Sequence, residues 1–206
     1  MEKDPTARCV VTIAASGAET AFAGTFSGGL DLSTPNEDGF AAFDLPLVVM
    51  KLLKRLLLFP LPTICILNGH AVAGGLFLGL CHDFRFMVDH KAIVSLPEIF
   101  LDMTMSPPYA AIMRHLLQPQ ALRLLVLGKR YNGKQALKMG IVDDLFKTDE
   151  ELWHLIYNMK NEVGIDSEKR EALSEIKRGT MHKITKSLES IPPVTVSRMI
   201  QENTKL

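Results

Sequence analysis

The chain has 206 residues, of which 47% are hydrophobic and 22% charged, which suits one well-buried core and is short for two. Basic and acidic residues both total 23, so no basic field is available to hold nucleic acid. The longest apolar run, residues 56–67, is broken by Pro60 and Pro62 and is too short to cross a bilayer. We expect one domain over 1–206, with no nucleic-acid partner and no transmembrane segment.

The N-terminal part alternates strand-length apolar runs with helical stretches. A β-branched run at 9–15 predicts a strand, and small and polar residues through Gly29 predict a loop. A helix is expected at about 44–59, a strand at 63–68, a turn at Asn68-Gly69 and a short helix at 73–81. Runs at 84–88 and 92–96 are expected to form a strand pair.

From residue 107 onward the apolar spacing becomes helical. Helices are predicted at 109–117, 120–127 and 133–139, followed by one late strand in 140–146. The region from about 149 to 206 is more charged and predicts surface or oligomer-forming helices, with a break at Pro192-Pro193. Repeated strand-then-helix units over about 1–148 indicate an α/β fold with a helical C-terminal region.

Small residues stand where the strand at 63–68 leads into the helix at 73–81. Ala73, Gly74 and Gly75 leave backbone N–H groups unshielded, which suits an anion or a developing oxyanion. They equally suit tight packing of the helix on the strand. A second stretch, Ser27-Gly28-Gly29 before Leu30, is either an ordinary glycine-rich loop or another backbone donor. Two donors from separate loops would make an oxyanion hole.

A carboxylate stands in an otherwise apolar stretch after the run at 92–96. Glu98 follows Pro97, and burying a carboxylate is costly, so Glu98 is a candidate general base. The competing interpretation is a glutamate that caps the start of a helix. The six histidines show no metal-binding spacing, and the three cysteines form no CxxC or Cys/His pattern, so we predict no metal site.

The order of these elements resembles the crotonase superfamily of enoyl-CoA hydratases and isomerases. The matching stretches are FSGGLDL, PTICILNGHAVAGGLFLGLCHDFRF, LPEIFLDM and ALKMGIVDDLF. These motifs are most similar to those of the peroxisomal-type Δ3,Δ2-enoyl-CoA isomerases. The resemblance implies a crotonase-type spiral of ββα units, shortened at the N-terminus because family members usually begin with a strand pair and a helix before residue 9.

The resemblance also implies the site residues. The oxyanion hole would be the backbone N–H groups of Leu30 and Gly74, and Glu98 would be the single catalytic glutamate. Hydratases of the family carry a second glutamate at the position of Phe77, so Phe77 favours an isomerase. His70, Pro107 and Tyr109 would line the substrate pocket with Phe77, although a structural role for His70 is an open alternative.

The remaining expectations follow from the same resemblance. The substrate would be an acyl-CoA, with CoA arriving as part of it and no separate cofactor. A trimer-type homo-oligomer or a place in a larger assembly is expected, and the alternative to an enzyme is a catalytically inactive structural subunit. The tail Thr204-Lys205-Leu206 is a weak variant of a peroxisomal signal, with the mitochondrion as the alternative compartment.

Overall fold

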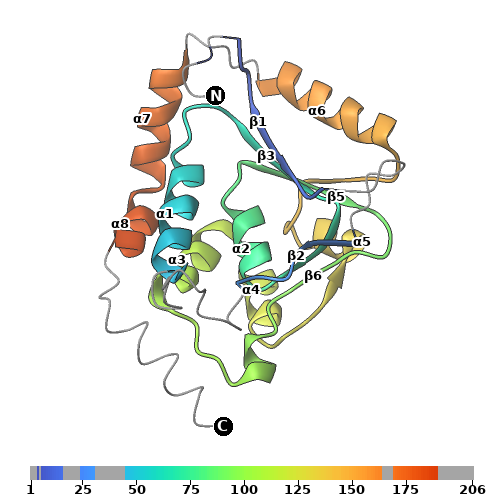
Figure 1. Ribbon diagram of the computed structural model, residues 1–206, viewed down its shortest axis with the longest axis vertical. Coiled ribbons are helices and arrows are strands. Elements are labelled where there is room, and N and C mark those ends of the chain that lie inside the picture. Colours follow the sequence, from blue (N-terminus) through green and yellow to red (C-terminus); the bar gives the residue numbers. More distant parts are fainter. Residues whose placement is uncertain (1–3, 5, 16–23, 31–44, 164–168, 190–206) are drawn as a thin grey trace, which may run out of the picture.

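The computed structural model describes residues 4, 6–15, 24–30, 45–163 and 169–189 (Figure 1). The expected break at Pro192-Pro193 and the tail Thr204-Lys205-Leu206 lie outside these residues. No helix of the described ranges is both long enough and apolar enough to cross a membrane.

Two four-stranded sheets form the framework. The first holds, in spatial order, four parallel strands: β1 (Val10–Ile13), β3 (Thr63–Leu67), β5 (Phe84–Val88) and β8 (Asp144–Phe146). The second holds three parallel strands and an antiparallel one: β2 (Gly24–Ser27), β4 (Gly69–Val72), β6 (Ile93–Ser95) and β7 (Tyr131–Asn132).

Successive strands alternate between the two sheets, from β1 through β6, and helices follow the strand pairs. This is the expected α/β spiral of ββα units, and the fold prediction is confirmed. The helices are α1 (Leu45–Leu57), α2 (Gly74–Leu80), the 3-10 helix η1 (Glu98–Leu101), α3 (Pro107–Leu116), α4 (Pro119–Leu125), α5 (Gly133–Lys138), α6 (Asp149–Val163), α7 (Arg170–Thr180) and α8 (His182–Glu189).

Two of the strand expectations were wrong. The runs at 84–88 and 92–96 do form strands, but β5 belongs to the first sheet and β6 to the second, so they do not pair with each other. The segment before Gly29, expected to be a loop, contains β2. The first error arises because local spacing identifies a strand but does not say which of two sheets receives it. The second arises because β2 is only four residues long and begins and ends with small residues, Gly24 and Ser27, so its sequence has the composition of a loop.

The corner between β3 and β4 sends the chain from one sheet to the other. The Asn68 side chain is fully buried, where its Nδ2 donates to the Ala14 carbonyl (3.0 Å) and its Oδ1 accepts from the Ala14 N–H (3.3 Å). A Cβ on Gly69 would lie 2.8 Å from the backbone of Gly24, so β2 approaches this corner more closely than any side chain permits. The expected turn is therefore a corner that joins the two sheets.

Helix α2 lies at the centre of the molecule, between the sheets and α3 (Figure 1). Leu76, Phe77 and Leu80 are each at most 2% exposed, which explains why α2 has apolar residues on all sides. His82, just after α2, holds this end of the helix. Its Nδ1 lies 2.8 Å from the Leu78 carbonyl and its Nε2 lies 2.8 Å from Thr12 Oγ1 on β1.

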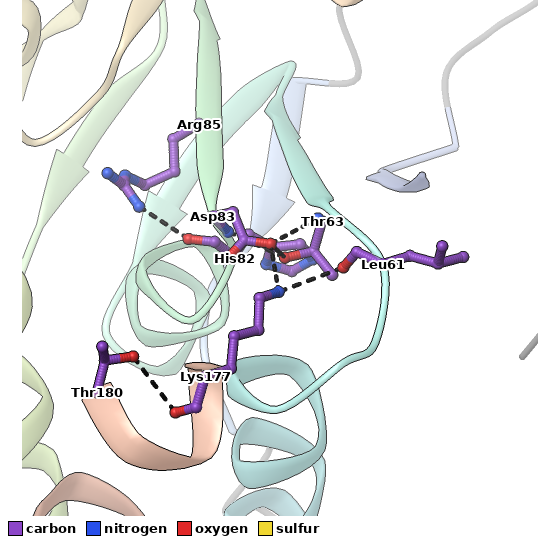
Figure 2. A network of polar contacts seen from close by, with 7 residues as sticks. All are labelled: Leu61, Thr63, His82, Asp83, Arg85, Lys177 and Thr180. Atoms are coloured by element: carbon purple, nitrogen blue, oxygen red, sulfur yellow. Dashed lines mark hydrogen bonds and ion pairs between the residues drawn. The ribbon is translucent and has the colours of Figure 1, made fainter. Parts of the chain in front are cut away.

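An ion pair with a buried lysine attaches α7 to the first sheet (Figure 2). Lys177 Nζ lies 2.6 Å from Asp83 Oδ2 and donates to the Leu61 carbonyl (3.2 Å). Asp83 Oδ2 also accepts from the backbone N–H (2.8 Å) and the hydroxyl (2.9 Å) of Thr63, the first residue of β3. The lysine side chain is 6% exposed and the aspartate side chain 28%, so the pair is shielded on the lysine side.

We predict that replacing Lys177 with methionine lowers the free energy of unfolding by about 2–3 kcal/mol, because the substitution leaves Asp83 without its cation. Methionine keeps a similar length and helix propensity. The measurement is urea unfolding followed by circular dichroism.

Arg178→Met is the matched control, since Arg178 pairs with Glu175 where both side chains are more than 60% exposed. We expect it to cost less than about 1 kcal/mol. Equal unfolding midpoints for the two variants would contradict a special role for Lys177.

Candidate active site

Two glycine-bearing segments from different ββα units touch through their backbones. A Cβ on Gly75 would lie 2.3 Å from the Ser27 carbonyl oxygen and 2.7 Å from Ser27 Cβ. A Cβ on Gly74 would lie 3.2 Å from Gly29 Cα and 3.4 Å from Leu30 N. The packing interpretation of these glycines is therefore correct for Gly75, and the same contact brings Gly74 beside Leu30.

Ala73, which precedes α2, has an unusual backbone conformation with φ 52° and ψ −123°. A side chain disfavours this region, and residues held there commonly occur at functional sites. Hydrogen bonds on both sides hold it, since its N–H donates to the Ser95 carbonyl (3.0 Å) and its carbonyl accepts from Leu76 N (3.0 Å) and Phe77 N (3.3 Å). This conformation sets the direction in which the chain enters Gly74.

The predicted oxyanion donors, Leu30 and Gly74, are brought together by this arrangement. Neither N–H has an acceptor among the described residues. Gly74 is the first residue of α2, and the first N–H groups of a helix have no partner within it. Two free donors side by side are the arrangement that a carbonyl oxygen with developing negative charge requires.

Glu98 is connected through β6 to Ala73, the residue that precedes α2. Ser95, the last residue of that strand, accepts the Ala73 N–H and pairs with Val72, and Glu98 begins η1 three residues later. Its backbone carbonyl accepts from Met103 N (3.0 Å), which closes the η1 turn. Glu98 therefore follows closely in the chain after the hydrogen bond that joins β6 to the residue before α2.

The Glu98 side chain is half-buried, and its Oε2 is buried without a hydrogen-bond partner. Burial raises the pKa of Glu98, and a hydrogen bond from its own backbone N–H offsets this only in part. Asp102 is exposed and ends η1 in a left-handed conformation (φ 50°). Desolvation and not a neighbouring acid is therefore what perturbs Glu98.

Tyr109 on α3 packs against Phe77 on α2, with ring centroids 4.3 Å apart. Phe77 is 2% exposed and lies one helical turn after Gly74. Burial, followed by electrostatic interactions with Cys81 and Glu98, raises the pKa of Tyr109 to about 12. At the position where the resemblance to hydratases would place a second glutamate, this chain has a ring packed against a neutral phenol with the ring planes tilted by 43°.

The other two expected pocket residues, His70 and Pro107, have different surroundings from each other. His70 Nδ1 accepts the Ile93 N–H (3.1 Å) and so links β4 to β6, which gives it the structural role left open above. Pro107 is exposed and starts α3. Within the described ranges no group of three His, Cys, Asp or Glu side chains is arranged to hold a metal ion.

Sequence reasoning missed two features of this region. The strained Ala73 left no local signal, because alanine is common before helices and nothing in the pattern indicates its φ. Ser106 was not singled out by the sequence, but its Oγ is buried without a partner one turn before Tyr109, and it makes no capping hydrogen bond at the start of α3. The pair Pro107-Pro108 directly after this serine was the only sequence signal that could have drawn attention to it.

Comparison with known proteins identifies the family. Residues 1–203 match the family model described as enoyl-CoA hydratase/isomerase, so the chain belongs to that family. Two Arabidopsis thaliana relatives are enoyl-CoA delta isomerase 2, peroxisomal (39% identical, covering 47% of this chain and 41% of the relative) and enoyl-CoA delta isomerase 3 (33% identical, covering 57% and 52%). The chain spans about half the length of these curated relatives.

Solved structures support the fold. An enoyl-CoA hydratase/isomerase family protein from Pseudomonas syringae is 26% identical, with a TM-score of 0.74 over 85% of this chain and 76% of that one. Human mitochondrial delta3-delta2-enoyl-CoA isomerase has a TM-score of 0.80 over 99% of this chain and 77% of that one. At 22% identity the human structure bears on the fold alone.

We predict that Gly75→Ala lowers the free energy of unfolding by about 1–3 kcal/mol, because the new methyl group would overlap the Ser27 backbone, which cannot move without disturbing β2. Thermal and urea unfolding measure the change.

Gly179→Ala is the control, since a Cβ there meets nothing within 4 Å and Gly179 lies in α7. Alanine in an open helical position stabilises by up to about 1 kcal/mol, so the two variants should change stability in opposite directions. A Gly75→Ala protein as stable as the parent would contradict the close approach of the two segments.

Proposed function

We propose that the protein is an enoyl-CoA isomerase that moves a double bond from C3 to C2 of an acyl-CoA. The N–H groups of Leu30 and Gly74 hold the thioester oxygen while the Glu98 carboxylate removes a proton from C2. The electron pair of the broken C–H bond passes into a dienolate, whose negative oxygen the two donors stabilise. Protonated Glu98 then returns the proton at C4, which leaves the conjugated 2-enoyl-CoA and restores the carboxylate.

The observation that carries this proposal is the environment of Glu98. A half-buried carboxylate with an unpartnered buried oxygen is unfavourable for stability, and desolvation makes it a better base at neutral pH. It stands three residues after Ser95, which is bonded to Ala73 next to the free N–H of Gly74. A base and an oxyanion site in this relation suit proton transfer next to a thioester.

Phe77 favours isomerisation over hydration. Hydration needs a group that activates water and a group that supplies a proton, and two carboxylates commonly share these tasks. At 2% exposure and in contact with Tyr109, Phe77 makes this side of the site apolar. A single base that carries one proton between two carbons needs no water, and an apolar wall keeps water away.

The partners and the compartment are part of this proposal. An acyl-CoA is the substrate, and no metal or redox cofactor takes part in the mechanism. The name of one of the two Arabidopsis relatives, enoyl-CoA delta isomerase 2, includes the word peroxisomal, which favours a peroxisome here. A homo-oligomer is supported by exposed apolar side chains, since Phe100 (66% exposed) contacts Gly128 and lies beside Leu127 (63% exposed).

We expect purified protein to convert a 3-enoyl-CoA to the conjugated 2-enoyl-CoA, and Glu98→Gln to lower kcat by at least about 10³-fold, because glutamine keeps the shape but cannot accept the proton. The rise in ultraviolet absorbance of the conjugated thioester measures turnover.

Glu189→Gln is the control, since Glu189 is exposed on α8 and pairs with Lys54 far from the site in the chain. Turnover by neither the parent nor the control, with both folded, would sink the isomerase proposal and leave the structural-subunit alternative. Unchanged turnover in Glu98→Gln would remove Glu98 from the mechanism.

The pH dependence of kcat/KM follows from the raised pKa of Glu98. The base acts only when ionised, so activity should fall as the pH drops through the pKa of Glu98 in the folded protein. Because desolvation raises that pKa, the acid limb should lie above the ordinary glutamate value of 4.5. A limb at or below that value would show that Glu98 is not the desolvated base. Stopped assays at constant ionic strength measure it.

A further inference from the structure

Three buried oxygen atoms near the start of α3 have no hydrogen-bond partner in the described part of the chain. They are Glu98 Oε2, Ser106 Oγ and Tyr109 OH. Buried polar atoms are nearly always paired, so each unpaired one requires an explanation. All three belong to one stretch of twelve residues that begins with the candidate base, so we looked for one explanation that involves the base.

Tyr109 and Glu98 are each linked to the first part of α2. Tyr109 reaches it through its ring contact with Phe77, one turn after Gly74. Glu98 reaches it through Ser95, which is bonded to Ala73. The charge of Glu98 is also one of the causes that raise the pKa of Tyr109, after burial and Cys81.

The protonation states of the two groups are complementary. Tyr109 stays a neutral phenol at physiological pH, so it can donate a hydrogen bond, and an ionised carboxylate can only accept. The other titratable group acting on Tyr109 is the Cys81 thiol, which is buried and whose own pKa burial raises, so it remains neutral. No charged group in the described part of the chain competes for the phenol proton.

We propose that Tyr109 is a positioning residue for Glu98, and that its hydroxyl donates a hydrogen bond to Glu98 Oε2. The terminal torsion of a glutamate is broad, so rotation of this half-buried carboxylate can bring Oε2 to the phenol at little cost. This inference rests on the proposed isomerase mechanism and extends it by assigning the second oxygen of the base.

The hydrogen bond has two consequences for the reaction. It occupies Oε2, so Oε1 is the oxygen that carries the proton from C2 to C4, and the carboxylate is held while it does so. A bond from a neutral donor to a carboxylate also stabilises the ionised form, which lowers the pKa of Glu98 against the effect of burial. Tyr109 thus keeps a desolvated base ionised at the working pH.

The test compares Tyr109→Phe with Tyr131→Phe. Phenylalanine keeps the ring packed on Phe77 and removes only the hydroxyl. Tyr131 is the matched control, because its hydroxyl is also buried and unpartnered but lies on β7. In Tyr109→Phe the acid limb of kcat/KM should move up by about one pH unit, the size expected for one hydrogen bond to a charged group. In Tyr131→Phe it should not move.

A direct titration separates this inference from the isomerase proposal. Glutamate labelled with ¹³C at Cδ reports the Glu98 carboxylate by NMR, with the signal assigned by its loss in Glu98→Gln. The Glu98 pKa should be higher in Tyr109→Phe than in the parent by the same unit, whether or not the protein turns over. A shift without turnover would keep the hydrogen bond and overturn the isomerase proposal.

The opposite results would overturn the positioning role. If the Tyr109 hydroxyl is only a buried group without a partner, Tyr109→Phe leaves the Glu98 titration unchanged and leaves the protein equally or more stable. Turnover with unshifted titration would reject the hydrogen bond and keep the isomerase. Equal shifts in both tyrosine variants would show a general effect of removing buried hydroxyls and would also reject it.

Discussion

The close contact between the backbones of segments 27–30 and 73–75 is the constraint on which the site depends. It joins two successive ββα units at the point where their chains leave the second sheet. No side chain fits at Gly75, and the strained Ala73 is held by hydrogen bonds to Ser95, Leu76 and Phe77. Strain of this kind costs on the order of 1–3 kcal/mol and persists only where the surroundings determine the conformation. In return, the contact sets two backbone N–H groups side by side without any side chain between them.

Helix α2 connects this contact to the rest of the molecule. Its first residue belongs to the candidate oxyanion site, and its apolar body is surrounded by the sheets and α3. Beyond its last residue, His82 binds Thr12 of β1, and Asp83 binds Thr63 of β3 and Lys177 of α7 (Figure 2). A short helix held at both ends cannot slide along the sheet. The C-terminal helices therefore support the geometry of the site, although no residue of α7 is assigned a part in the chemistry.

Two acids in this fold have opposite surroundings, which suits a structural role for one and the proposed catalytic role for the other. Asp83 has a lysine and two donors from Thr63, so its charge is compensated and it stabilises the fold. Glu98 Oε2 has no partner in the described residues, so desolvation acts on it without compensation. A protein tolerates an uncompensated carboxylate where the carboxylate is used. The phenol of Tyr109, proposed as its donor, would stabilise the ionised form without a second charge that binds the proton in competition.

The sequence by itself determined the α/β class, the positions of most helices and the family resemblance, and it singled out Gly74 and Glu98 as candidate site residues. These follow from local apolar spacing, from the prolines that end helices and from motifs a few residues long. Only the tertiary structure decided that β5 and β6 enter different sheets, that β2 exists before Gly29 and that Asn68 is a buried corner. It also decided that Leu30 meets Gly74, that Lys177 reaches Asp83 and that Tyr109 packs against Phe77. These contacts join residues tens of positions apart, and their energy comes from close packing and desolvation, which depend on the complete fold and leave no periodic trace in the chain.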